Sequence, residues 1–240
     1  MKYFQNFPTV EYTFGENLSS DNFQNIAIFA DVIDQVKDVA STYEDYHILP
    51  GERPDQVSFQ LYDVTDYHWT FELMNPKIRE QGWPLSNDEV YNLALAEYSE
   101  LVLTTRTKLT DKFKLGQTVS GNTSGHSGII QHRELDLGQI WLKDKTGNFS
   151  AGETVQSTNS DGVVESITLQ SAELRYNAAH HYESGSEPVD IDPEVGPASN
   201  TEITWLERLT SQNDNLKQIR VLKSSVIKEV VDAFKKSVRI

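Results

Sequence analysis

The stretch HILPGERPDQVSFQLYDVTDYHWTFELMN, residues 47–75, combines an extended start, a glycine turn and an aromatic-rich helical pattern. Ile48 is expected in extended backbone, and Gly51 permits the turn that follows it. Pro54 suits the first turn of a helix. A unit this small, with tyrosine and tryptophan near a glycine turn, fits a sugar-binding module. It equally fits a scaffold whose aromatic side chains fill its own core.

Further helices are predicted within and after this stretch. Apolar residues at helical spacing predict one helix that runs through Tyr62 and a second that starts near Trp69. The second should stop at Asn75, because a residue that precedes proline disfavours helical backbone. After a turn around Trp83, a serine followed three residues later by glutamate forms a capping box, which predicts a helix over 87–102.

The N-terminal region opens with extended aromatic residues and continues with a helical pattern. In the segment 22–40, apolar residues recur at intervals of three and four, which predicts one buried helix face. Its members are Ile26, Phe29, Ile33, Val36 and Val39.

Residues 109–174 are rich in glycine, serine and threonine, and alternation replaces the helical period. FKLGQTV at 113–119 is repeated as FSAGETV at 149–155, and each copy is followed by a glycine turn and a β-branched run. Alternation bounded by glycine turns predicts strands and hairpins. The two copies therefore indicate a small barrel or sandwich, inserted between two helical segments.

The C-terminal part returns to helical periodicity after a Pro-, Gly- and Asp-rich connection. Residues 201–240 are expected to form a helix, a short strand around Ile219 and Val221, and a last helix with a continuous apolar stripe. That stripe either closes the core of its own domain or docks on a partner helix or groove.

The composition limits the function. With 36 acidic and 21 basic residues, the net charge of −15 argues against a general nucleic-acid surface. The absence of cysteine excludes disulfides, thiolate metal sites and cysteine nucleophiles. No apolar run is long enough to span a membrane, and the start lacks the pattern of a signal peptide, so we expect synthesis and folding in a cytosol. No catalytic constellation or metal-ligand spacing stands out, so we expect no enzyme activity, no metal and no cofactor.

The opening stretch resembles the lysin-motif (LysM) family. That family's pattern is an extended Tyr-x-[Val/Ile], a turn, a helix ending in tyrosine, and a Trp-led helix closing on Asn-Pro. The matching positions are Tyr46, Ile48, Gly51, Tyr62, Trp69 and Asn75. Two features depart from the pattern: Arg53 replaces a small hydroxyl residue, and a segment that contains Trp83 displaces the returning strand.

Longer phrases resemble the baseplate wedge proteins of contractile-tailed (myovirus) bacteriophages. The central phrase is 62–69, followed by 73–75 and 83–86. An N-terminal phrase at 3–12 and a C-terminal phrase at 215–223 resemble the same family. The phrases occur in family order and cover about half of the chain.

The resemblance implies a LysM-like βααβ core between an N-terminal arm and a C-terminal strand and helix. The chain as a whole is expected to have an α+β fold, with helical flanks and with the inserted small all-β domain that the repeat indicates, which is not part of the family pattern. The expected segments are an N-terminal arm and helix (1–43), the LysM-like core with the following helix (44–108), the inserted β domain (109–174), an irregular linker (175–200) and a C-terminal helix, strand and helix (201–240).

The resemblance also implies a structural role: joining adjacent wedges into the closed baseplate ring of the virion tail, after assembly in the host cytoplasm. The partners would be other wedge subunits, neighbouring wedges and the sheath initiator, with six copies in a hexagonal ring and no nucleic acid or membrane. The residues expected to face these partners are Tyr3, Phe4, Phe7, Tyr12, Ile219, Val221, Ile227, Val231 and Phe234. The alternative function is a LysM module that binds peptidoglycan or N-acetylglucosamine.

Overall fold

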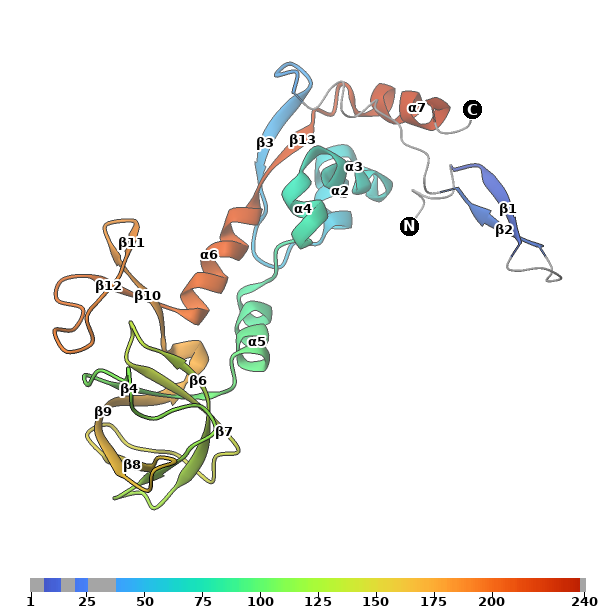
Figure 1. Cartoon of the computed structure of the whole chain (residues 1–240). Helices are drawn as coiled ribbons and strands as arrows, with labels where there is room; N and C mark the ends of the chain where they lie inside the picture. Colours follow the sequence, from blue (N-terminus) through green and yellow to red (C-terminus); the bar gives the residue numbers. More distant parts are fainter. Residues whose placement is uncertain (1–6, 14–19, 26–37, 238–240) are drawn as a thin grey trace. The chain divides into compact units, whose positions relative to one another are not determined.

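The computed structural model describes residues 7–13, 20–25 and 38–237. It has a mixed α+β fold with several separate sheets (Figure 1), which confirms the predicted class. Two compact units form. Unit 1 contains the described residues up to Asn87 and those from Gln212 onward, and unit 2 contains Asp88–Ser211. Within the described ranges, no helix is both long and apolar enough to cross a membrane.

An antiparallel hairpin, the N-terminal hairpin, begins the described chain. Strand β1 (Thr9–Thr13) pairs with β2 (Ser20–Gln24). The helix predicted over 22–40 is therefore wrong for residues 22–24, where the cross-strand apolar pair Val10 and Phe23 favours a ladder. Most of the predicted helix, residues 26–37, lies outside the described residues.

Two strands from distant parts of the sequence meet in unit 1. Strand β3 (Tyr43–His47) pairs antiparallel with β13 (Gln218–Leu222), with Tyr46 opposite Ile219, and Figure 1 shows them side by side. Between β3 and unit 2 lie four helical elements: α2 (Pro54–Tyr62), η2 (Thr65–Tyr67), α3 (Trp69–Met74) and α4 (Pro76–Gln81). The second strand thus comes from the far end of the chain.

Local sequence explains the helix boundaries in unit 1. Pro54 occupies the first turn of α2, and the Gln56 side chain accepts a hydrogen bond from the Arg53 backbone N–H at 3.0 Å. Asn75 has extended backbone and ends α3, as predicted. Its side-chain amide donates to the carbonyls of Phe71 and Arg220 at 2.8 Å, and its side-chain oxygen accepts the Arg220 N–H at 2.8 Å. Asn75 therefore joins the end of α3 to β13.

The core of unit 1 contains residues from near the start and near the end of the described chain. One cluster contains Ile48, Val57, Phe71, Ile78, Leu216, Ile219 and Val221. The second contains Phe7, Trp69, Met74, Leu222, Ile227, Val230, Val231 and Phe234, the last four from α7 (Ile227–Ser237).

The predicted partner-facing role is wrong for several of these side chains. Ile219, Val221, Ile227, Val231 and Phe234 are each at most 4% exposed. They are buried because β13 completes the two-stranded sheet and α7 presents its apolar stripe to the same core. The sequence left open whether this stripe closes its own domain, and in the structure it does.

Unit 2 begins with α5 and a closed barrel. Helix α5 (Asn87–Glu97) ends earlier than predicted, because Leu101, Val102 and Leu103 are all buried in a strand. The barrel order is β4-β7-β6-β5-β8-β9. Its strands are β4 (Leu101–Thr105), β5 (Thr118–Gly121), β6 (Ser127–Glu134), β7 (Gln139–Lys143), β8 (Thr154–Thr158) and β9 (Val164–Leu174). The β region thus starts at Leu101, ahead of the predicted 109.

The segment 175–200 is not an irregular linker as predicted. A short helix η3 (Arg175–Asn177) leads into a sheet of order β11-β10-β12. Its strands are β10 (Ala179–Ser184), β11 (Glu187–Val189) and β12 (Thr201–Thr204). The hairpin between β10 and β11 turns at Gly185, whose φ of +72° suits glycine. Helix α6 (Trp205–Lys217) then returns the chain to β13.

Unit 1 offers a matched pair of phenylalanines to test this core. Phe71 is fully buried, whereas Phe59 on α2 is 55% exposed. Phe71→Ala should lower the free energy of unfolding of unit 1 by about 3–5 kcal/mol, since it removes a buried ring and leaves a cavity. Phe59→Ala should change it by less than about 0.5 kcal/mol. Urea denaturation compares the two variants, and equal effects would contradict the assigned core.

Candidate functional site

The loop after β3 is closed by one glutamate. The Glu52 carboxylate accepts hydrogen bonds from the Leu49 backbone N–H at 2.8 Å and from the Tyr46 hydroxyl at 3.1 Å. Burial, together with Glu52, raises the pKa of Tyr46 to about 12. The Glu52 carbonyl accepts the Trp83 indole N–H at 2.6 Å, and the Glu52 N–H donates to the Leu49 carbonyl at 3.1 Å. The polar backbone of this loop is therefore largely satisfied within the chain.

The remaining predicted core positions also lie in unit 1. Ile48 and Trp69 are buried, and Gly51 forms the turn with a φ of +82°. The Tyr62 hydroxyl donates to the Leu222 carbonyl at 2.7 Å, and burial raises its pKa. Trp83 packs its ring against Phe71, with 5.9 Å between centroids. The structure thus brings the predicted core residues into one small unit.

The N-terminal hairpin exposes apolar residues on both of its strands. Every residue of both strands is exposed, including Val10 at 44%, Tyr12 at 56% and Phe23 at 45%. Phe7, by contrast, is 6% exposed and contacts Phe234, with 6.4 Å between ring centroids. The other two predicted arm residues, Tyr3 and Phe4, lie outside the described residues.

An arginine in unit 2 lies against two tryptophan rings that are nearly perpendicular to each other. The Arg175 guanidinium carbon lies 3.8 Å from the centroid of the Trp141 ring and 3.9 Å from that of Trp205. Its other contacts are the Tyr98 ring at 5.0 Å and the Glu100 carboxylate at 3.6 Å. Stacked cation–π contacts hold η3 and the start of α6 against the barrel. This is a packing arrangement that supports the fold.

Two adjacent histidines pack beside this arginine. A β-bulge in the pairing of β10 with β12 brings the Nδ1 atoms of His180 and His181 to 2.9 Å. His180 lies against the Trp205 ring, with 4.5 Å between centroids. Burial, followed by the positive charge of Arg208, lowers the pKa of His180 to about 4. His180 is therefore neutral near pH 7.

Four further acidic residues of unit 2 lie in two different settings. A cavity of about 240 Å³ contains Glu173, whose pKa burial raises, and Glu202, which accepts a 3.1 Å hydrogen bond from Tyr182. Asp192 and Glu194 instead form ion pairs with Lys108 at 3.0 and 3.4 Å. Among the described residues, no group of three or more His, Cys, Asp or Glu side chains is placed to hold a metal ion.

The sequence did not point to the arginine that contacts two tryptophans or to the acidic cavity. Trp141 and Trp205 are 64 positions apart, and no local pattern links them to Arg175. Glu173 and Glu202 both line this cavity because the three-stranded sheet packs beside the barrel. Strands β10 and β11 of that sheet lie in the segment predicted to be irregular, and β12 lies where a helix was predicted to begin. The Gly185 turn was the one local signal for that sheet.

No protein-family model matches the chain, and no curated protein matches its sequence.

The low pKa of His180 predicts a pH dependence of stability. In the unfolded chain this histidine should titrate near its usual value of 6.5, whereas in the folded chain its pKa is about 4. The unfolded state therefore binds the proton first as the pH falls. The stabilisation is complete above about pH 6.5 and is lost progressively toward pH 4.

Histidine NMR titration and urea denaturation test this prediction together. His180→Gln should flatten the fall in stability between pH 6.5 and pH 4. An ordinary titration of His180 in the folded protein would contradict its burial against Trp205.

Proposed function

We propose that this chain is a structural component of the baseplate of a contractile phage tail, which joins adjacent wedges into the closed ring. The observation that carries the proposal is the exposed N-terminal hairpin. Phe7, which precedes β1, is buried in the core of unit 1, and the hairpin itself has an apolar face.

Cross-strand register gives the hairpin two unlike faces. Paired residues and alternate residues share a face in an antiparallel ladder. Val10 pairs with Phe23, and Tyr12 pairs with Asp21, so three exposed apolar side chains lie on one face. The other face carries only polar residues: Thr9, Glu11, Thr13, Ser20, Asn22 and Gln24.

A two-stranded hairpin with this much exposed apolar surface is marginally stable by itself in water. Docking its apolar face on another subunit would bury Val10, Tyr12 and Phe23 and order the strands at the same time. An amphipathic ribbon anchored at one end therefore suits a protein that links neighbours in an assembly.

Unit 1 supports a LysM-like fold for the scaffold. The spatial order β3, α2, α3, β13 corresponds to the βααβ pattern of that family, with the second strand supplied after unit 2. In this proposal, the β3–β13 ladder and the helices of unit 1 form the rigid body, and the N-terminal hairpin is the joining element. The partners are other wedge subunits, neighbouring wedges and the sheath initiator, with six copies per ring in the virion and no nucleic acid or membrane contact. No enzyme activity is assigned.

The alternative function is binding of peptidoglycan or N-acetylglucosamine chains by the LysM-like core. A depression of about 680 Å³ lined by Gly51, Glu52, Phe59 and neighbouring residues favours it, because the exposed Phe59 ring could stack on a sugar. Lysin motifs, however, hold sugars through loop backbone groups. Here the Leu49 N–H, the Leu49 carbonyl and the Glu52 carbonyl are already bonded to Glu52 or Trp83, so the scaffold role is the better supported.

Changing the apolar face of the hairpin tests the joining role. Val10→Ser, Tyr12→Ser and Phe23→Ser together should leave unit 1 folded, because Phe7 stays in the core. Each substitution should remove about 1 kcal/mol or more of the free energy gained by burying that side chain on docking. Together the three should weaken docking by roughly a hundredfold or more. Complementation of a phage that lacks this gene should then give few infectious particles and unjoined wedges by electron microscopy.

The matched control replaces two apolar residues exposed elsewhere. Leu135 and Val195 are 42% and 79% exposed, and changing both to serine should leave the particle yield at the wild-type level. Normal particles from the hairpin variant would overturn the joining role.

Calorimetric titration with chitin oligomers separates the two functions. The satisfied backbone of the 49–53 loop predicts no saturable binding at this site. Trp83→Phe frees the Glu52 carbonyl and serves as the comparison variant. Saturable micromolar binding by the wild-type chain, lost on changing Phe59 to serine, would favour the sugar-binding alternative.

A further inference from the structure

A register shift in the barrel turns a carboxylate toward the cavity of about 240 Å³ in unit 2, which we call the mixed-charge cavity. In β9, Ile167 and Leu169 point into the barrel core, and regular alternation would send Glu173 there too. The shift in the pairing of β9 with β4 changes this alternation, so that Ala172 packs against the core and Glu173 lines the cavity outside it. Bulges of this kind commonly re-aim side chains beside functional sites.

Three charged side chains line the mixed-charge cavity: Glu173 from β9, Glu202 from β12, and Arg106, which follows β4. Tyr182 lies opposite Glu202 in the ladder of β10 and β12 and donates its hydroxyl to Glu202 Oε2 at 3.1 Å. The Ser171 hydroxyl donates to Glu173 Oε1 at 2.8 Å. Each carboxylate is therefore held by one hydrogen bond and keeps its second oxygen available to a ligand.

The opposite charges of this cavity are not paired with each other. Within the described part of the chain, Arg106, Glu173 and Glu202 form no ion pair. Arg106 and Glu202 are exposed and Glu173 is half-buried, so a ligand can reach all three. Burial raises the pKa of Glu173, and the negative charge of Glu202 adds to the increase. Gly196 leaves room for the guanidinium, since a Cβ there would overlap it. The cavity therefore presents charges of both signs that lack a counter-charge.

We propose that the mixed-charge cavity binds a small zwitterionic amino acid. Its ammonium would donate hydrogen bonds to the free oxygens of Glu173 and Glu202, and its carboxylate would accept hydrogen bonds from the Arg106 guanidinium. An ammonium has three donors, and a guanidinium matches the geometry of a carboxylate. One ligand thus supplies a partner to all three charged groups. The inference is independent of the assembly role proposed for the N-terminal hairpin.

The size and the remaining lining of the cavity favour an amino acid with an apolar side chain. A volume of about 240 Å³ lies below the usual range of drug-sized sites, which limits the ligand to about a single amino acid. Leu137, Ile191 and Pro197 line the same cavity and offer apolar contacts to a ligand side chain. Leucine and valine have the size and the hydrophobicity that these contacts require.

Other ligand classes satisfy fewer of these groups. A phosphate or a simple carboxylate would pair with Arg106 but would lie close to two like charges. A simple amine would pair with the two glutamates and leave Arg106 without a partner. A neutral sugar would displace water from three charged groups without supplying a counter-charge. A ligand that carries both an ammonium and a carboxylate avoids each of these costs.

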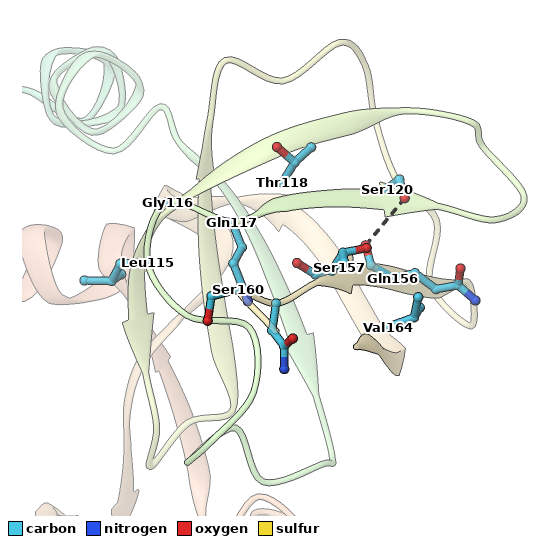
Figure 2. A pocket seen from close by; sticks show the side chains of 11 residues that line it. Leu115, Gly116, Gln117, Thr118, Ser120, Gln156, Ser157, Ser160 and Val164 are labelled. Atoms are coloured by element: carbon cyan, nitrogen blue, oxygen red, sulfur yellow. Dashed lines mark hydrogen bonds between the residues drawn. The ribbon is translucent and has the colours of Figure 1, made fainter. Parts of the chain in front are cut away.

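The larger depression on the barrel lacks the features that select a ligand. Its volume is about 720 Å³, and Figure 2 shows the side chains that line it, among them Leu115, Ser120 and Gln156. None of its lining residues is charged. It therefore serves as a comparison region of the same unit, where an amino acid should not bind.

Charge-neutral variants separate ligand binding from folding. Glu173→Gln removes the repulsion from Glu202, so the melting temperature should stay the same or rise. Glu173→Gln and Arg106→Gln should each weaken amino-acid binding by about tenfold or more, because a charge-assisted hydrogen bond is lost. Glu187→Gln is the matched control: it removes an exposed carboxylate from β11 of the same sheet and should bind as the wild type does.

The measurement is ¹⁵N–¹H NMR of the full-length chain titrated with leucine and valine. Isopentylamine and isocaproate are the comparison ligands, since they lack the carboxylate and the ammonium of leucine respectively. We expect leucine or valine to shift the amide resonances of 170–173, 182 and 202 saturably and to leave those of 115–120 in place. Both comparison ligands should bind at least about tenfold more weakly than the amino acid.

The proposal is overturned if neither amino acid moves the resonances of the mixed-charge cavity, or if isopentylamine or isocaproate binds as tightly as the amino acid. It is also overturned if Glu173→Gln and Arg106→Gln bind as the wild type does.

Discussion

The ladder between β3 and β13 is the contact on which the rest of unit 1 depends. It joins residues 43–47 to residues 218–222 and continues at both ends through backbone bonds of 2.9 Å, from Ile48 to Lys217 and from Lys223 to Thr42. Helices α2 and α3 pack against this ladder and bury their apolar side chains there. Every apolar side chain of α2 and α3 that is buried depends on a strand supplied from the far end of the sequence.

This constraint also explains how a whole barrel is accommodated within the chain. The segments that leave and re-enter unit 1 are held together where Leu85 and Asn213 exchange two hydrogen bonds, at 2.7 and 3.0 Å. Unit 2 can therefore carry its own core and its own surface while unit 1 keeps a closed fold. In the proposed assembly role, the β3–β13 ladder and the helices of unit 1 supply rigidity, and the N-terminal hairpin supplies attachment.

Local sequence signals predicted local features well. Pro54, Asn75 and the repeated Phe-x-x-Gly phrases gave a helix start, a helix end and the inserted β structure, because each acts through its own backbone or its nearest neighbours. Such signals could not identify the partner strand of β3, since no turn or spacing links residues 43–47 to residues 218–222. For the same reason Phe234 was predicted to face a partner although it is buried.

The most direct test of the account is a disulfide across the β3–β13 ladder, in a chain that has no cysteine of its own. Asp45 and Arg220 are opposite each other and exposed, so Asp45→Cys with Arg220→Cys should oxidise rapidly and leave the protein folded. Asp45→Cys with Gln218→Cys, displaced by two residues along β13, should cross-link slowly. Equal cross-linking of the two pairs, or none in the first, would contradict the discontinuous unit that the account places at its centre.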